Sequence, residues 1–162
     1  MENLNKAIVT IRSILHGSIY GAQSAIATAK GFILDKKNGL LLTNKHIANK
    51  TLIQDLYVTF FNNHHVASSL LYNDPEHDFA IIQVAAYEVP EACMQLRLSE
   101  VLPSAGEAVY MPLYNEDGVN NFRYGVVLDP HVSMGYFSTH VILTNLRAGY
   151  GYSGSPICNK DG

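Results

Sequence analysis

The sequence lacks several features that would indicate whole classes of protein. Its 11 basic and 14 acidic residues give a formal net charge of −3 and form no runs. Without a basic patch, the chain has no electrostatic footprint for nucleic acid or for an anionic membrane. No apolar run approaches the 18 or so residues of a membrane-spanning helix. We therefore expect a protein that binds neither nucleic acid nor membrane.

Cysteine is also scarce, with only Cys93 and Cys158. Two cysteines suit a reducing compartment, although the sequence also permits one disulfide between them. Near the N-terminus, Lys6 and Arg12 bound an apolar stretch of five residues, which is too short and too interrupted for a signal peptide. The sequence predicts an intracellular protein, cytoplasmic or nuclear, unless a leader precedes Met1.

Short apolar or β-branched runs separated by turn residues dominate the 162 residues. Nine have strand length: AIVTIRSI, GFILD, LLLTN, LYVTFF, HVASSLLY, FAIIQVA, EAVYMPL, RYGVVLD and THVILTN. Between two of them, KKNG holds an Asn-Gly pair that predicts a hairpin. Many short strands at this spacing are typical of an all-β protein, either a barrel or a sandwich.

Three segments depart from this pattern. Residues 3–15 fit either a helix or a strand, and one helical turn is plausible after Thr43. Residues 85–106 are the least strand-like part of the chain. We expect them to connect two β halves.

Three residues together indicate a nucleophilic site. Ser153 lies in GYSGS, where Gly151 and Gly154 let the chain turn sharply and aim its N–H groups at one point. Acyl transfer by serine also needs a base and an acid that orients the base. His46 ends one strand-like run, and Asp78 directly precedes another. Each residue alone has an ordinary explanation, but their occurrence in the order His, Asp, Ser favours a catalytic triad.

The blocks GFILDKKNGLLLTNKHIAN, DPEHDFAIIQV and GYSGSPICNKDG resemble the signature blocks of the HtrA/Deg family of trypsin-like serine proteases. The likeness is greatest to the protease domains of its tandem-protease eukaryotic branch. It implies two antiparallel β-barrels of the trypsin/chymotrypsin type, the first over 1–88 and the second over 89–162. Relatives continue past the serine block with further strands, so we expect the second barrel to be incomplete at its C-terminal end.

The resemblance also implies residue roles. His46 would be the general base, Asp78 the orienting acid and Ser153 the nucleophile. The backbone N–H groups of Gly151 and Ser153 would form the oxyanion hole. The activity implied is that of a serine endopeptidase, which hydrolyses protein or peptide substrates through an acyl-enzyme and needs no cofactor.

The primary specificity pocket of such a fold would be shaped by Arg147, Ala148 and Gly149. An Arg147 that points into the pocket would favour acidic substrate side chains, and the alternative is a solvated loop residue. Asp74 is a second candidate for the orienting acid, but the Asp-Pro pair is more typical of a turn.

Neighbouring histidines raise the question of a metal. His64 and His65 are adjacent, and His77 lies near them in the sequence. Adjacent residues of a strand point to opposite faces, so the pair is poorly placed to bind one ion, and we expect no metal.

Three functions follow from these patterns. An active endopeptidase is favoured by the intact set of His46, Asp78 and Ser153. A catalytically inactive or partner-dependent binding or scaffold module is favoured by the short stretch after Ser153. An esterase of the same mechanism would need an open, shallow pocket. The expected partners are a protein or peptide substrate, and either a homo-oligomer or a chain that completes the second barrel.

Overall fold

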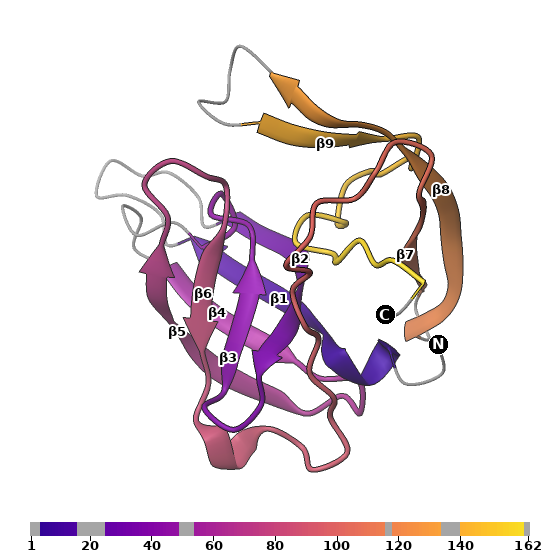
Figure 1. Cartoon of the computed structure of the whole chain (residues 1–162). Coiled ribbons are helices and arrows are strands. Elements are labelled where there is room, and N and C mark those ends of the chain that lie inside the picture. Colours follow the sequence, from indigo (N-terminus) through magenta and orange to yellow (C-terminus); the bar gives the residue numbers. More distant parts are fainter. Residues whose placement is uncertain (1–3, 16–24, 49–53, 116–117, 134–139, 161–162) are drawn as a thin grey trace.

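The computed structural model describes residues 4–15, 25–48, 54–115, 118–133 and 140–160 (Figure 1). Almost all of the regular structure in this part is β. In chain order the elements are η1 (Leu4–Ala7), β1 (Ile8–Leu15), β2 (Ala25–Asp35), β3 (Leu40–Thr43), β4 (Gln54–Thr59), β5 (His65–Asn73), β6 (Ala80–Gln83), η2 (Ala86–Glu88), β7 (Ala108–Asn115), β8 (Gly118–Ser133) and β9 (His140–Thr144). Each predicted strand-like run overlaps one of these strands, so the prediction of an all-β chain is confirmed.

The first six strands close into a barrel with the order β1-β2-β3-β6-β5-β4, and every pair is antiparallel. The pairing of β1 with β4 closes the ring, which removes the open sheet edges that invite aggregation. Of residues 3–15, which fitted either element, the described part (4–15) begins as the short η1 turn and continues as β1, and residue 3 lies outside the described residues.

Alternating residues of the strands fill the barrel. In β1, Val9 and Ile11 are buried while Arg12 is exposed, as expected for a strand with one face on a core. The largest fully buried aliphatic side chains come from different strands and include Ile11, Ile33, Leu41 and Ile82. One continuous core therefore supports the rim on which the candidate site is built.

The hairpin predicted at KKNG is confirmed. Strand β2 ends at Asp35 and β3 begins at Leu40, with the four turn residues between them. The Asp35 carboxylate accepts hydrogen bonds from the backbone N–H of Asn38 (3.2 Å) and from its side-chain amide (2.6 Å). Gly39 follows with φ +67°, in the left-handed region that favours glycine.

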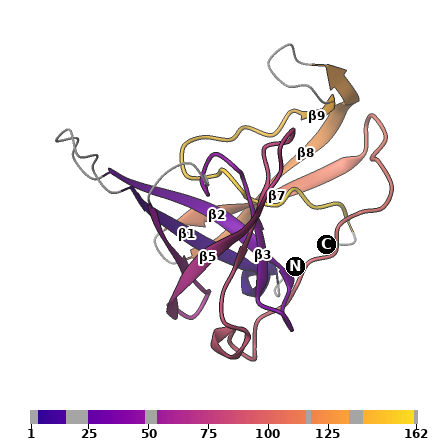
Figure 2. The same cartoon turned by 90° about the vertical axis from the view of Figure 1, so that its left-hand side faces the viewer.

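The second half is a three-stranded antiparallel sheet with the order β7-β8-β9. Residues 85–106 connect it to the barrel, as predicted, and contain only the short η2 turn. Both views show the hairpin of β8 and β9 on one side of the barrel (Figures 1 and 2). The described part of the second half is thus a partial sheet beside a complete barrel.

A small apolar cluster joins the two halves. Leu4 and Ile8, at the start of the chain, pack with Tyr110 of β7 and Cys158. Cys158 also forms a two-way backbone bridge with Tyr110, in which both N···O distances are 2.9 Å. Cys93 and Cys158 are both buried free thiols, so the disulfide that the sequence permitted does not form. No helix in the described ranges is long and apolar enough to cross a membrane.

The left-handed turn at Gly39 should be sensitive to any side chain. A Cβ at this position would lie 2.3 Å from the carbonyl oxygen of Val84. At Gly106, where φ is +85°, a Cβ would meet nothing within 4 Å. We expect Gly106→Ala to lower the free energy of unfolding by about 1–2 kcal/mol, the cost of the backbone conformation. Gly39→Ala should lower the free energy of unfolding by clearly more, as measured by urea denaturation. Equal decreases in the two variants would contradict the close approach of Gly39 to Val84.

Candidate active site

The pairing of β3 with β6 brings His46 and Asp78 together. Thr43, the last residue of β3, pairs with Ala80, the first residue of β6, so the turns that leave these strand ends meet at one rim of the barrel. His46 lies in a turn in which the Ala48 N–H donates to the Asn44 carbonyl (3.4 Å), the single helical turn expected after Thr43.

Both oxygens of the Asp78 carboxylate hold His46. Its Oδ2 lies 2.7 Å from Nδ1 of the imidazole, and its Oδ1 accepts the backbone N–H of His46 at 2.9 Å. The side chains are 52% and 36% exposed, so the pair is open to solvent on one side. The bond to a carboxylate indicates that Nδ1 carries the proton, which leaves the lone pair on Nε2.

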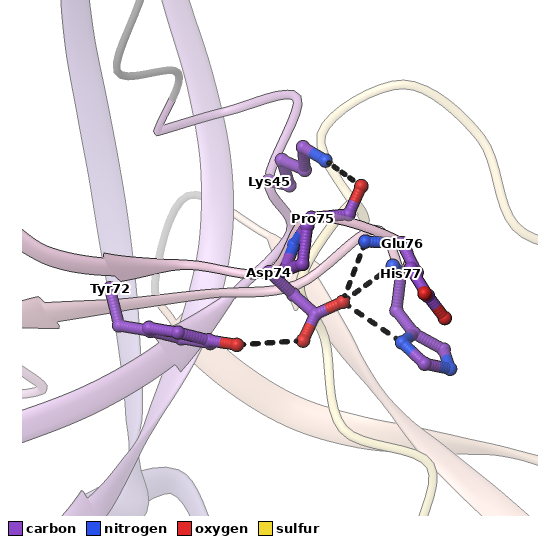
Figure 3. A network of polar contacts seen from close by, with 6 residues as sticks. All are labelled: Lys45, Tyr72, Asp74, Pro75, Glu76 and His77. Atoms are coloured by element: carbon purple, nitrogen blue, oxygen red, sulfur yellow. Dashed lines mark hydrogen bonds and ion pairs between the residues drawn. The ribbon is translucent and has the colours of Figure 1, made fainter.

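Asn44 and Lys45 also hold the loop that carries Asp78. The Asn44 side-chain amide donates to the carbonyl oxygen of Asp78 at 2.8 Å. The Lys45 ammonium donates to the carbonyl oxygen of Pro75 at 3.1 Å (Figure 3). Three consecutive residues after β3 therefore bind residues 74–78. The sequence patterns did not point to Asn44 or Lys45, although their position beside His46 was an available signal.

Asp74, the second candidate for the orienting acid, binds groups of its own turn and of the end of β5. Its carboxylate accepts the N–H groups of Glu76 and His77, together with Nδ1 of His77 and the hydroxyl of Tyr72 (Figure 3). These donors, above all the His77 N–H, hold the pKa of the Asp74 carboxyl well below its usual range. The Asp-Pro pair thus forms a turn, as predicted, and Asp78 contacts His46.

The serine loop consists of two consecutive β-turns, over residues 149–152 and 152–155. In each, the first carbonyl accepts the N–H of the fourth residue, at 3.3 and 2.9 Å. The third residues are Gly151 (φ +86°) and Gly154 (φ +80°), and a positive φ at this position is the mark of a type II turn. Ser153 is the second residue of the second turn, and the flanking glycines permit both bends.

This loop docks on the barrel beside the strand that leads to His46. The carbonyl oxygen of Ser153 accepts the backbone N–H of Lys30 in β2 at 2.7 Å. The hydroxyl of Thr43, at the end of β3, donates to the carbonyl oxygen of Lys30 at 2.8 Å. The yellow C-terminal segment accordingly runs between β2 and the second sheet (Figure 1). Ser153 is thereby held near the strand end from which His46 arises.

The remaining candidates lie in more open positions. Arg147, Ala148 and Gly149 are all exposed, the first two between β9 and the serine turns and Gly149 as the first residue of the first turn. The guanidinium of Arg123 in β8 donates to the carbonyl oxygen of Arg147, which ties the start of this segment to the sheet.

The three histidines considered for a metal have separate neighbours. His64 stacks on Phe60 with ring centroids 6.1 Å apart, and Nδ1 of His65 lies 2.8 Å from the Thr59 hydroxyl. His77 binds Asp74. Within the ranges that the structure describes, no three or more His, Cys, Asp or Glu residues form a group that could hold a metal ion.

The fold of this chain is similar to that of a solved structure. The chain superposes on the crystal structure of Deg5 with a TM-score of 0.71 at 18% identity, over 98% of this chain and 76% of that one. This similarity concerns the fold. The sequence comparison identifies the family. The chain belongs to the trypsin-like peptidase family, whose domain model matches residues 29–162.

Curated relatives carry the name pro-apoptotic serine protease NMA111. The protein from Debaryomyces hansenii is 30% identical over 174 residues, which cover 99% of this chain and 17% of that protein. The protein from Coccidioides immitis is also 30% identical over 174 residues, covering 100% of this chain and 16% of its own length. These relatives confirm the predicted resemblance to the HtrA family. The chain spans about a sixth of their length.

Docking of the serine loop should depend on Gly154. A Cβ there would lie 2.0 Å from the Lys30 carbonyl oxygen and 2.6 Å from the Thr43 hydroxyl. Gly149→Ala is a matched control in the same loop, because a Cβ at this position would meet nothing within 4 Å. We expect Gly154→Ala to lower the free energy of unfolding by more than about 1 kcal/mol, and Gly149→Ala to change it by less than about 0.5 kcal/mol. Indistinguishable denaturation curves would contradict the docked loop.

The ionised Asp74 should make the loop over residues 74–78 sensitive to acid. Because folding lowers the pKa of this carboxyl, its stabilisation is present above the unfolded-state value of about 3.9 and is lost as the pH falls toward the lower folded-state pKa. The Tm difference between the wild type and Asp74→Asn should therefore be greatest near pH 6–7 and shrink below about pH 4. A difference that is constant down to pH 2 would contradict the charged contacts.

Proposed function

We propose that this chain is the catalytic part of a serine endopeptidase, in which His46 is the general base, Asp78 orients it and Ser153 is the nucleophile. The observation that carries the proposal is the 2.7 Å contact between His46 Nδ1 and Asp78. This contact assigns the basic lone pair to Nε2, while the serine loop docks through Lys30 beside the strand end that leads to His46. The family of the chain supports the same chemistry.

The reaction proceeds in two halves. His46 Nε2 takes the proton of the Ser153 hydroxyl as the oxygen attacks the carbonyl carbon of the substrate. The resulting imidazolium gives that proton to the leaving amine, which departs and leaves an acyl-enzyme. A water molecule, activated by His46 in the same way, then releases the acid and restores Ser153. Asp78 stays ionised throughout and stabilises the imidazolium.

The oxyanion hole in this proposal consists of the backbone N–H groups of Gly151 and Ser153. Both belong to the two turns of the serine loop, whose shape sets the direction of these donors. The space beside Gly151 is open, because a Cβ there would meet no atom within 4 Å, so a substrate carbonyl has room to approach. Arg147, Ala148 and Gly149 would line the neighbouring specificity pocket, from the exposed segment that leads into the turns.

We also propose a domain organisation, substrates, partners and a cellular compartment. Residues 1–88 would form the barrel that holds His46 and Asp78, and residues 89–162 would contribute a partial second barrel that holds Ser153. Protein or peptide segments would be the substrates, and a homo-oligomer or a completing chain would be the partner. Two buried free thiols are consistent with a reducing intracellular compartment, cytoplasmic or nuclear.

Covalent labelling by a fluorophosphonate probe tests the proposed triad. We expect the wild-type chain to label at a single serine. Ser153→Ala should abolish this labelling, and His46→Ala should slow it by roughly 10⁴-fold, because the hydroxyl then lacks its base. Asp78→Asn should also slow it severely, since the amide no longer selects the proton on Nδ1. The readouts are the rate of probe incorporation and the mass of the labelled peptide.

Matched controls separate this chemistry from general effects. Ser104→Ala and His64→Ala remove an exposed serine and an exposed histidine outside the proposed site, and should label as the wild type does. A folded wild type that does not label would contradict the proposed activity and would favour the binding or scaffold function. Labelling that survives in Ser153→Ala would contradict the assignment of the nucleophile. Turnover of a peptide substrate as well as an ester would separate a protease from an esterase.

A further inference from the structure

The loop over residues 74–78 carries two histidine–aspartate pairs. Asp78 binds His46 across the rim, and Asp74 binds His77 within the loop itself, with an Nδ1–Oδ1 distance of 2.9 Å. The proposed mechanism uses only the first pair. The second pair is nevertheless well ordered by its contacts, which suggests a role in the same site.

Asp74 has a dense set of hydrogen bonds for a residue in a surface loop. Its Oδ1 accepts the N–H of Glu76 (3.0 Å), the N–H of His77 (2.6 Å) and the imidazole of His77, while its Oδ2 accepts the hydroxyl of Tyr72 (3.0 Å) (Figure 3). The Asp74 side chain is only 13% exposed, against 50% for His77. A carboxylate that is mostly withdrawn from water and accepts four donors is a rigid anchor for the atoms around it.

These contacts determine the backbone path to Asp78. Two successive N–H groups, of Glu76 and His77, point at one oxygen of Asp74, which holds the two peptide units that end one residue before Asp78. The N–H of Asp74 donates to the carbonyl oxygen of Phe79 at 3.1 Å and closes the loop at its base. The two ends of the loop are joined by this bond, and its middle is bound to the Asp74 carboxylate. The Cα of Asp78 therefore has little freedom to move.

We propose that Asp74 is a positioning residue for the catalytic pair, holding the loop in the shape that lets one Asp78 carboxylate span both the N–H and Nδ1 of His46. This inference rests on the proposed function, because the effect on rate appears only if Asp78 and His46 act in catalysis. Lys45 and Asn44 hold the same loop from the β3 side, so Asp74 supplies the support from within. Its action on the reaction is indirect, through Asp78.

The support depends on the ionised form of the Asp74 carboxyl. The groups that face Asp74 are the Tyr72 hydroxyl and His77, with Lys45 bound to the next residue, Pro75. The hydrogen bonds to Asp74, above all the one from the His77 N–H, hold its pKa below the usual range, so it is an ionised acceptor at neutral pH. The loop thus keeps this support at neutral pH.

The test compares three variants of the whole chain. Asp74→Ala removes both carboxylate oxygens that accept hydrogen bonds, whereas Asp74→Asn keeps one oxygen for the N–H groups of Glu76 and His77. Asp35→Ala is the matched control, because Asp35 holds the β2–β3 turn by similar bonds to Asn38 at the opposite end of β3 from His46. Two quantities are measured: the second-order rate constant of fluorophosphonate labelling, and the downfield proton NMR signal of His46 Nδ1–H, assigned by its absence in His46→Ala.

We expect Asp74→Ala to label about 10- to 100-fold more slowly than the wild type and to lose or shift the His46 signal, since small displacements of a catalytic group have effects of this size. Asp74→Asn should stay within about threefold of the wild-type rate and keep the signal. Asp35→Ala should label at the wild-type rate, even if it is less stable to urea.

Several outcomes would overturn the inference. One is a folded Asp74→Ala with the wild-type rate and an unchanged His46 signal. Another is an equal loss of rate in Asp35→Ala, which would mean that the effect is general destabilisation. If Asp74→Ala does not fold, Asp74→Asn decides. A folded Asp74→Asn that loses labelling and the His46 signal is incompatible with the proposed role of the acceptor oxygen. A folded Asp74→Asn that retains both supports that role.

Failure of the proposed function gives a different result. In that case the wild type would be folded, would show the His46 signal and would not label at all. The comparison of the His46 signal between the wild type and Asp74→Ala would then decide the positioning role by itself. Loss of the signal would support it, and an unchanged signal would overturn it.

Discussion

The antiparallel pairing of β3 with β6 is the constraint on which the candidate site depends. It sets Thr43, at the end of one strand, opposite Ala80, at the start of the other. The two turns that leave these strand ends meet at one rim, and only there can His46 and Asp78 come within hydrogen-bonding distance. Because the barrel is closed, a shift of either strand would break pairs on both of its sides, so the register is strongly held.

The serine loop depends on the same barrel through backbone contacts. Its anchor is the bond from the Lys30 N–H to the Ser153 carbonyl oxygen, and the close approach leaves no room for a side chain at Gly154. Strand β2 therefore acts as a common support: it pairs with β3, which leads to His46, and it binds the loop that carries Ser153. Two segments more than a hundred residues apart are brought to one place by a single strand.

Much of the fold and of the candidate site could be predicted from local patterns. Short apolar or β-branched runs identified the strands, the Asn-Gly pair identified the β2–β3 turn, and glycines on either side of Ser153 indicated the sharp turns observed there. The sequence also favoured Asp78 over Asp74 as the partner of His46, because an Asp-Pro pair is typical of a turn. It did not indicate Asn44 or Lys30, whose contacts join residues distant in the sequence.

By itself, then, the sequence determined the positions of the strands, the turn chemistry and the residues able to form a catalytic triad. These depend on side-chain alternation and backbone preferences over a few residues. Only the tertiary structure decided the strand order that closes the barrel, the arrangement of the second sheet and the direct contact between Asp78 and His46. His46 and Asp78 are 32 positions apart, and such a contact forms only when non-local strand pairing brings the two turns to the same rim.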